Sequence, residues 1–372
     1  MPRPIQARIH ASALRHNLAL VKDILAKTPT PSKVWAVVKA NAYGHGLENA
    51  ITGLQSADGI ALLDLEEAAR ARQALWEKPI LLLEGPFEEA DIRLVRELDL
   101  TPVIHNMDQL GMIESAGIGV MDVYIKVDTG MARLGFTVDN YEAAFDRVEQ
   151  LRRSGKIGNV TYMTHFARAD LADGLDEPLR VFVNMVGGRD GDWCVSNSAA
   201  CLKHAKRVGA LAQLHGHSLW SRPGICLYGA SPLIDASADD LDLRPAMTLS
   251  SELISVKDVQ AGQGVGYGHT FVADKAMRVG VVACGYADGY PRHAPTGTPV
   301  AVQGQMTRLI GRVSMDMITV DLSELPEAEV GSEVVLWGQN GPSADEVALA
   351  AGTISYELLS AVTARVPRVR VP

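Results

Sequence analysis

The sequence has 372 residues, of which 47% are hydrophobic and 21% charged, and its formal net charge is −9. This composition is typical of a folded, water-soluble protein, and it excludes a disordered or fibrous chain. No basic cluster stands out, so we expect no nucleic-acid partner. No apolar run approaches the roughly 18 residues that a membrane helix needs, so we expect no membrane partner either.

Four cysteines, Cys194, Cys201, Cys226 and Cys284, are scattered along the chain without metal-like spacing. Such scattered cysteines in a large chain favour free thiols in a reducing compartment. The N-terminal stretch lacks the apolar segment of a signal peptide, so a cytoplasmic location is predicted. The ten histidines form no HExxH motif, and no metal site is predicted.

Short apolar runs alternate with segments of helical spacing over the first two thirds of the chain. The strand candidates cover residues 34–40, 58–64, 79–85, 101–106, 122–128, 159–166, 192–198 and 217–224. Near-continuous apolar strands are typical of a parallel sheet that is covered on both faces. Eight strand–helix units predict an α/β fold with an N-terminal (β/α)8 TIM-like barrel. An open doubly wound sheet is the alternative, although no GxGxxG motif follows the first strand.

The remaining third of the chain has a different pattern. Strand-like runs separated by Gly- and Pro-containing turns cover residues 246–259, 277–290, 298–313, 317–323 and 332–339. One helical stretch covers 343–362, and the final residues 365–371 could close a sheet. We therefore predict a barrel domain over 1–240 and a mainly β domain over 241–372, with the boundary in an Asp- and Ser-rich segment.

Polar side chains occupy the ends of the predicted barrel strands, where catalytic residues gather in this fold. They are Lys39, Asp64, Glu84, His105, Lys126, Asp128, His165, Ser198 and Arg222. Asp64, Glu84 and His105 could simply be solvated loop-entry residues. Lys39 directly follows the apolar run "VWAVV", and a lysine in an apolar setting loses its proton readily and can form a Schiff base. The alternative is a lysine that extends into water.

The eighth unit contains "SRPGICLYG", which places a glycine at the start of a short possible helix. Barrels often bind phosphate after strands seven and eight, through backbone N–H groups at a helix N-terminus. Ser198 ends strand seven and could donate its hydroxyl to the same anion. A Schiff-base lysine combined with a phosphate site fits pyridoxal 5′-phosphate, whereas an ordinary helix cap is the alternative for the glycine alone.

Six blocks of the sequence resemble the signatures of bacterial alanine racemase, in the order of that family and over nearly the whole chain. They are "AVVKANAYGHG", "YIKVDTGMARLGF", "RPGICLYG", "GVGYGHTF", "GRVSMDMITVD" and "TISYE". The resemblance implies a pyridoxal-phosphate enzyme that interconverts L- and D-alanine, either to supply D-alanine for peptidoglycan or for alanine catabolism. The alternatives are a broad-specificity racemase or a basic amino-acid decarboxylase of the same fold. A non-catalytic carrier of the cofactor is a further alternative, but such proteins are shorter and lack the β domain.

The resemblance also implies roles for single residues. Lys39 would bind the cofactor covalently and act as one catalytic base, with Tyr267 as the other. The residues implied to hold the phosphate are Tyr43, Ser198, Gly224, Ile225 and Tyr356. Arg222 would face the pyridine nitrogen, and His165 would lie between Arg222 and Tyr267.

The substrate would be bound by Arg133, Met315 and Asp316, if the resemblance holds residue by residue. Members of the family are head-to-tail homodimers, so Tyr267, Met315 and Asp316 would complete the active site of the partner subunit. Lys126 matches a lysine that is carbamylated in some members, where it orients Arg133.

One position departs from the family pattern, because "MARLG" replaces the common "MGRLG" and puts Ala132 beside Arg133. Glycine adopts a positive φ without cost and alanine does not. The loop is therefore predicted to be either ordinary or slightly strained at Ala132.

Overall fold

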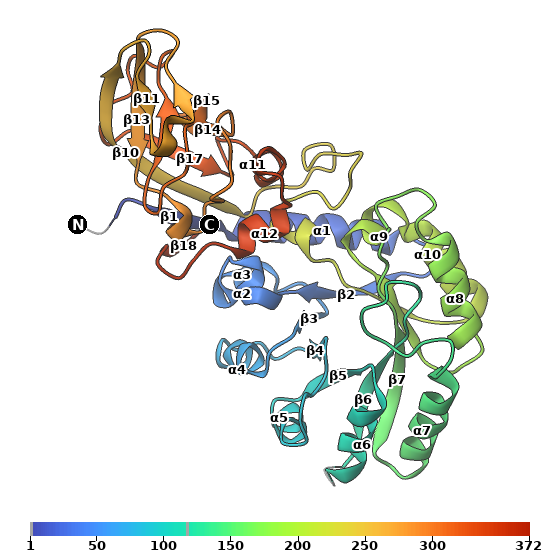
Figure 1. The fold of residues 1–372 in the computed structure, drawn as a ribbon. Coiled ribbons are helices and arrows are strands. Elements are labelled where there is room, and N and C mark those ends of the chain that lie inside the picture. The colour runs from blue at the N-terminus through green and yellow to red at the C-terminus, as the bar shows by residue number, and fades with distance from the viewer. Residues whose placement is uncertain (1–2, 117–118) are drawn as a thin grey trace.

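The computed structural model describes residues 3–116 and 119–372, and eight of its strands close into a parallel barrel (Figure 1). The barrel strands are β2 (Ser32–Val37), β3 (Gly59–Leu62), β4 (Ile80–Leu82), β5 (Leu100–Ile104), β6 (Met121–Lys126), β7 (Ile157–Met163), β8 (Asp192–Ser196) and β9 (Leu219–Ser221). β2 pairs with β9 in parallel register, with Ser32 opposite Leu219, and this pairing closes the barrel. The predicted (β/α)8 barrel is confirmed.

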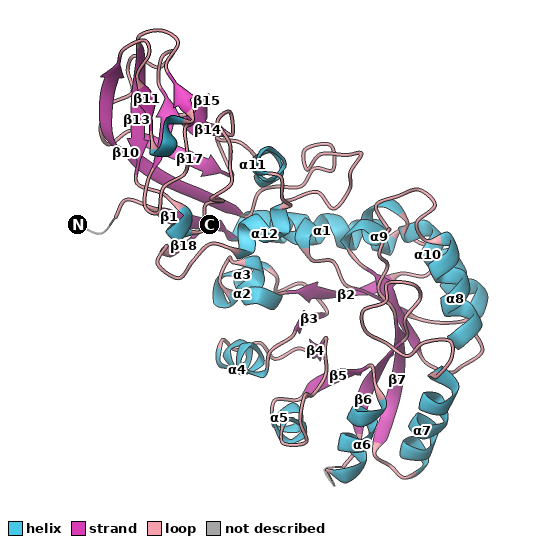
Figure 2. Cartoon of the chain, in the orientation of Figure 1, coloured by secondary structure: helices cyan, strands magenta, loops and turns pink. Residues whose placement is uncertain are grey.

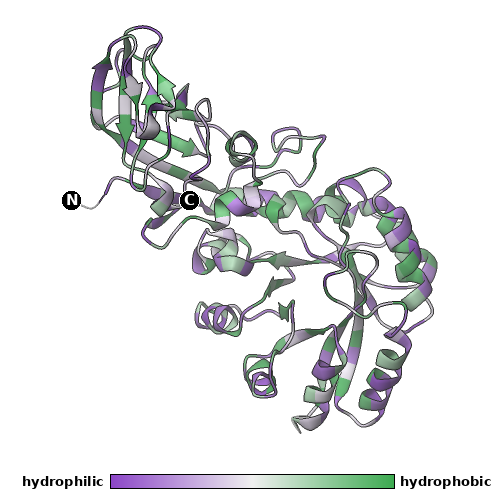
Figure 3. Cartoon of the chain, viewed as in Figure 1, coloured by the Kyte–Doolittle hydropathy of each residue, from purple (hydrophilic) through white to green (hydrophobic). Residues whose placement is uncertain are grey.

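Helices surround this barrel, as Figure 2 shows. They are α1 (Ala11–Ala26), α2 (Lys39–Tyr43), α3 (Leu47–Gly53), α4 (Leu65–Gln73), α5 (Asp91–Glu97), α6 (Met107–Ser115), α7 (Tyr141–Arg153), α8 (Asp176–Val186), α9 (Ser198–Lys203), α10 (Ala205–His215) and the 3-10 turn η1 (Ile225–Tyr228). The outer helices carry both hydrophobic and hydrophilic residues, as expected where one face packs on the strands (Figure 3). Asp64 is the N-cap of α4, because its carboxylate accepts hydrogen bonds from the N–H groups of Glu66 and Glu67. Asp64 is thus a loop-entry residue.

The second part is a mainly β domain, as predicted. Its main sheet has the order β13 (Met277–Val282), β16 (Ile318–Asp321), β15 (Gln305–Ile310), β14 (Pro299–Val302), β17 (Glu333–Trp337), β10 (Met247–Val259), β1 (Gln6–His10) and β18 (Arg368–Val371). The smaller elements of this part are β11 (Gly264–Val265), η2 (Tyr267–His269), β12 (Phe271–Val272), η3 (Tyr286–Asp288), α11 (Ala344–Ala351) and α12 (Ser355–Ser360). The predicted helical stretch 343–362 is therefore two helices, and Gly352 ends the first of them in a left-handed conformation.

The first strand of the chain belongs to this sheet and not to the barrel. β1 pairs with β10 in antiparallel and with β18 in parallel register. The predicted boundary placed residues 6–10 with the barrel, so the structure differs from the prediction here. Ala7 and Ile9 are fully buried in the sheet, and the backbone groups of this strand pair with β10 and β18, which are both distant in the sequence.

The barrel and the β domain meet where α12 packs on α2. A Cβ atom at Gly44 would lie 2.0 Å from the backbone oxygen of Leu359 in α12, so glycine is required for this close approach. The contact brings Tyr356 of the C-terminal segment to the mouth of the barrel. No helix in the described part of the chain has the length and apolar character needed to cross a membrane.

Candidate active site

A cavity of about 820 Å³ lies at the C-terminal ends of the barrel strands. The predicted site residues that line it are Lys39, Tyr43, Lys126, Arg133, His165, Ser198, Arg222, Gly224, Ile225 and Tyr356. They come from positions that are up to 317 residues apart in the sequence, and the barrel and α12 bring them together. Glu84 and His105, which the sequence left as either site or loop-entry residues, line the same cavity.

Lys39 starts a turn of unusual backbone conformation. Ala40, Asn41, Ala42 and Tyr43 all have a positive φ, between 51° and 55°. Each non-glycine residue in this left-handed region costs roughly 1–2 kcal/mol, so such strain persists only where the surroundings enforce it. The sequence predicted only a small loop here, because no local pattern signals four consecutive left-handed residues.

Polar partners hold this strained turn in place. The N–H of Asn41 donates to Glu67 Oε1 at 2.5 Å, and the amide oxygen of Asn41 accepts from the N–H of Leu47 at 3.1 Å. The ring of His45 is fully buried, and its Nδ1 lies 3.0 Å and 2.9 Å from the carbonyl oxygens of Ala42 and Tyr43. Burial lowers the pKa of His45 to about 4, so its ring is neutral near pH 7. Sequence reasoning missed Glu67 and His45, although His45 lies within the block "AYGHG".

Tyr43 is fixed at the cavity wall by aromatic neighbours. Its ring stacks on Tyr228 with a centroid distance of 4.6 Å and lies 6.2 Å from the ring of Tyr356. The hydroxyl of Tyr228 donates to the carbonyl oxygen of Val37 at 2.9 Å, which anchors this aromatic cluster to β2. Sequence reasoning missed Tyr228, which follows Gly224 within the block "RPGICLYG".

Ser198, Gly224 and Tyr43 form a small polar cradle at the ends of β8 and β9. The N–H of Gly224 donates to Ser198 Oγ at 2.8 Å. A Cβ atom at Gly224 would lie only 2.5 Å from Tyr43 Oη, so a side chain there would fill the space between them. The hydroxyl groups of Ser198 and Tyr43 therefore lie beside the backbone at the start of η1, and none of these groups carries a negative charge. This arrangement fits a phosphate group.

Arg222 lies buried at the end of β9, and carbonyl oxygens hold its guanidinium. Its Nη1 donates to the carbonyl oxygen of Cys194 at 2.5 Å, and its Nη2 donates to that of Thr164 at 2.6 Å. Among the described residues, no carboxylate forms an ion pair with Arg222, and its Nε makes no hydrogen bond. Since a guanidinium only donates, it suits a neutral nitrogen acceptor such as that of a pyridine ring.

Burial and neighbouring cations lower the pKa of three basic groups in the cavity. The pKa of Lys39 is lowered mainly by burial and then by Arg133, while Glu84 opposes the shift. The pKa of Lys126 falls to about 8, because of burial and then Arg222 and Arg133. The half-buried His165 has a pKa far below its usual range, for the same reasons. A cluster of cations in a confined space thus keeps His165 neutral and favours neutral lysine amines.

The loop that carries Arg133 is organised by one carboxylate. Asp128 Oδ1 accepts hydrogen bonds from the N–H groups of Gly130, Met131 and Ala132, at 2.9, 2.9 and 3.2 Å. Ala132 has a φ of +54°, so the residue that departs from the family pattern lies in the left-handed region. The sequence left open whether the loop at Ala132 is ordinary or strained, and the structure has a strained loop.

Tyr267, Met315 and Asp316 do not reach the cavity of their own chain. They lie in the β domain and do not line the cavity; Tyr267 is 70% exposed and Met315 54% exposed. The structure therefore brings together the residues predicted for the cofactor and separates from them the residues predicted to serve a partner subunit.

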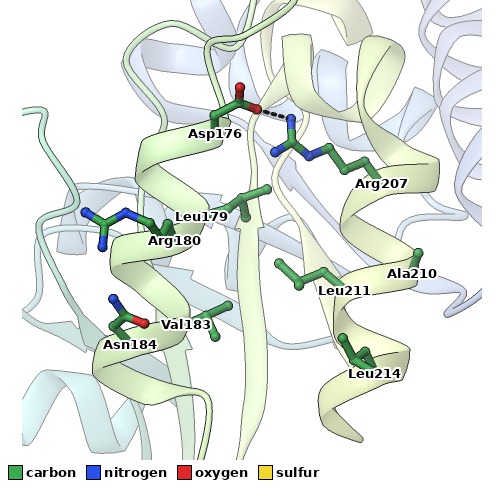
Figure 4. A pocket seen from close by; sticks show the side chains of 9 residues that line it. All are labelled: Asp176, Leu179, Arg180, Val183, Asn184, Arg207, Ala210, Leu211 and Leu214. Atoms are coloured by element: carbon green, nitrogen blue, oxygen red, sulfur yellow. Dashed lines mark ion pairs between the residues drawn. The ribbon is translucent and has the colours of Figure 1, made fainter.

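A second hollow, of about 500 Å³, lies between α8 and α10 on the outside of the barrel (Figure 4). Leu179, Val183, Leu211 and Leu214 line it, and Asp176 and Arg207 form an ion pair at its rim. It contains none of the predicted site residues, and its hydrophobic lining offers no nucleophile. Neither in this hollow nor elsewhere in the described chain do three or more His, Cys, Asp or Glu side chains lie in a position to hold a metal ion.

Comparison with known proteins gives consistent matches over both parts of the chain. The family described as "Alanine racemase, N-terminal domain" matches residues 9–232, and the one described as "Alanine racemase, C-terminal domain" matches residues 246–370. An alanine racemase of Bordetella petrii is 54% identical over 375 residues, which covers 99% of both chains. The chain also resembles the crystal structure of the biosynthetic alanine racemase from Pseudomonas aeruginosa, with 45% identity, a TM-score of 0.91 and full coverage of both chains. The alanine racemase of Acinetobacter baumannii is 35% identical with a TM-score of 0.88, over 99% of this chain and 100% of that chain.

Proposed function

Because this chain belongs to the alanine racemase family, we propose that it interconverts L- and D-alanine with bound pyridoxal 5′-phosphate and two bases, Lys39 and Tyr267. The family relationship covers both parts of the chain. One observation carries the proposal for the cofactor. Lys39 has a lowered pKa and lines the same cavity as the polar cradle of Ser198, Gly224 and Tyr43.

The chain's own residues would hold the cofactor at two ends. Lys39 would bond to its aldehyde carbon, because an unprotonated amine is the nucleophile in Schiff-base formation. The phosphate would be bound by Tyr43, Ser198, Gly224, Ile225 and Tyr356. The Nε of Arg222 would donate to the pyridine nitrogen, and Arg133 would bind the carboxylate of alanine through its paired N–H donors.

Pyridoxal 5′-phosphate, when bound, delocalises the electron pair that is left at the substrate Cα, so the Cα proton becomes removable. Inversion then needs a base on each face of the substrate. Lys39 would be released when the amino group of alanine takes its place on the cofactor. Tyr267 of the partner subunit would then remove the proton from L-alanine on one face, and the freed Lys39 would return a proton to the other face. For D-alanine the two residues exchange roles. His165, which stays neutral, would link Arg222 to the tyrosine hydroxyl.

The exposure of Tyr267 and Met315, beside the half-buried Asp316, supports a homodimer in which the β domain of each subunit completes the other site. The cavity of a single chain lacks the proposed second base, because Tyr267 does not line it. We therefore expect that neither Lys39→Ala nor Tyr267→Phe homodimers racemise alanine. Heterodimers of the two variants contain one intact site, so random re-association of equal amounts should restore about a quarter of the activity.

Four measurements test the proposed function. Borohydride reduction of the holoenzyme should label Lys39, as read by peptide mass spectrometry, and an unlabelled Lys39 would refute the covalent role. Exchange of the α-proton of alanine in D₂O separates an enzyme from a cofactor carrier. A panel of L-amino acids, with alanine preferred, separates an alanine enzyme from a broad-specificity racemase. A deletion strain that requires added D-alanine would identify a role in peptidoglycan supply.

A further inference from the structure

A buried carboxylate in the β domain has no role in the proposed reaction. Asp288 ends the turn η3 in the segment "GYADG", and its side chain is fully buried. Its Oδ2 accepts a hydrogen bond from the N–H of Gly285 at 2.9 Å. An ionised carboxylate is costly to bury unless charged partners compensate it, so this position calls for an explanation.

Two arginines from opposite ends of the chain compensate Asp288. Arg365 Nε lies 2.8 Å from Oδ1, and Arg3 Nη2 lies 3.3 Å from Oδ2. The same two arginines also reach one further residue, Asp316. Arg365 Nη2 lies 2.8 Å from Asp316 Oδ1, and Arg3 Nη2 donates to the backbone oxygen of Asp316 at 2.8 Å. Each arginine thus connects the buried carboxylate to Asp316.

The backbone beside Asp288 holds the same loop. The N–H of Tyr286 donates to the carbonyl oxygen of Ser314 at 3.1 Å, and that of Ala287 to the carbonyl oxygen of Met315 at 3.0 Å. A Cβ atom at Gly285 would lie 2.3 Å from the backbone oxygen of Met315, so only glycine permits this approach. The loop 314–316 is therefore attached to η3 by its backbone and to Asp288 through the two arginines.

We propose that Asp288 is a positioning residue, which acts through Arg365 and Arg3 to hold Met315 and Asp316 in the geometry that binds alanine in the neighbouring subunit. The inference rests on the proposed function, in which these two residues contact the substrate. An exposed loop that serves a second subunit needs such support, because no cavity wall of its own chain fixes its side chains. Asp288 is fixed in η3, so the arginines that pair with it can hold the carboxylate of Asp316 in one position.

Arg365 is the position to test, because its guanidinium links the side-chain carboxylates of Asp288 and Asp316, whereas removal of Asp288 would also take away the acceptor of the Gly285 N–H. In Arg365→Gln the link between the two carboxylates is lost, so KM for L-alanine should rise about tenfold while kcat changes less than about threefold. Arg365→Lys keeps one charge without the planar fork and should give an intermediate KM. Arg308→Gln is the matched control, since it removes an ion pair with Asp321 in the same domain, at 3.0 Å, and should leave KM unchanged.

A double-variant cycle separates this inference from the proposed function. Asp316→Ala should raise KM, and adding Arg365→Gln to it should cause little further change, because both changes break one connection. If Asp316→Ala leaves KM unchanged, the substrate role of this loop is refuted. If Asp316→Ala raises KM but Arg365→Gln lowers only the melting temperature, or if the two effects multiply, the positioning role is refuted. Should Arg365→Gln not fold, Arg3→Ala, near the chain terminus, should raise KM about threefold, and an unchanged KM would overturn the inference.

Discussion

The space beside Gly224 gives a sharp prediction for cofactor binding. In Gly224→Ala the new Cβ would lie 2.5 Å from Tyr43 Oη, whereas ordinary van der Waals contact begins near 3.4 Å. The Tyr43 hydroxyl must therefore move by about 0.9 Å, in an interior that is packed too tightly to absorb the shift easily. Gly224 has a φ of −125°, which lies outside the left-handed region, and the Cβ contact with Tyr43 is the effect of the substitution that the double-variant cycle isolates.

The expected loss is that of one hydrogen bond to a charged group. The proposed contact of Tyr43 with the phosphate is worth about 1.5–3 kcal/mol, which corresponds to a roughly 10- to 150-fold higher Kd for pyridoxal 5′-phosphate. Tyr43 cannot simply rotate away, because Tyr228 stacks on its ring and Tyr43 lies in the strained left-handed turn. We expect Gly224→Ala to weaken cofactor binding by at least about tenfold.

Titration of the apoenzyme with pyridoxal 5′-phosphate measures this Kd, and a double-variant cycle identifies the cause. In Tyr43→Phe the hydroxyl is absent, and the nearest atom to the new Cβ is the ring carbon Cζ, at 3.2 Å. In the Tyr43→Phe background, Gly224→Ala should then raise the Kd for pyridoxal 5′-phosphate by less than about threefold. Gly188→Ala is the control, because a Cβ atom there meets nothing within 4 Å. An unchanged Kd in Gly224→Ala, or full additivity in the cycle, would refute the proposed binding of the phosphate by Tyr43 beside Gly224.

Three further predictions concern the strained loop, the buried histidine and the buried lysine. Ala132→Gly should raise the free energy of unfolding by up to about 1 kcal/mol, because relief of the left-handed strain exceeds the entropy cost of glycine; a destabilised variant in chemical denaturation would contradict this. The pKa of His45 is about 4 in the folded protein and 6.5 ordinarily, so the unfolded chain binds more protons and stability falls as the pH drops from about 6.5 to about 4. This loss amounts to up to about 3 kcal/mol, and the difference in urea stability between the parent and His45→Gln should therefore change over that window; a constant difference would exclude His45 as a cause. With a pKa of about 8, Lys126 has an appreciable neutral amine fraction near pH 7, so native mass spectrometry in CO₂-containing buffer should detect a carbamate that Lys126→Arg lacks. An unmodified amine at saturating CO₂ would end that proposal.

Much of this protein was determined by short-range patterns in its sequence. Eight apolar runs predicted the eight barrel strands, because each strand must bury both faces and so leaves a continuous hydrophobic stretch. Lys39 could be singled out because it follows such a run at the end where barrel enzymes place their chemistry. The signature blocks extended the prediction of site residues to Arg222, Gly224 and Tyr356, which line one cavity in the structure.

The tertiary structure alone decided which distant segments meet. The pairing of β1 with β10 and β18, the left-handed turn at residues 40–43 and the link from Asp288 to Asp316 left no local signal in the sequence. A hydrophobic period is set by neighbours a few residues away, so it can be recognised in a short window. Backbone strain and buried charge persist only when contacts from remote parts of the chain compensate them, and those contacts exist only in the folded molecule.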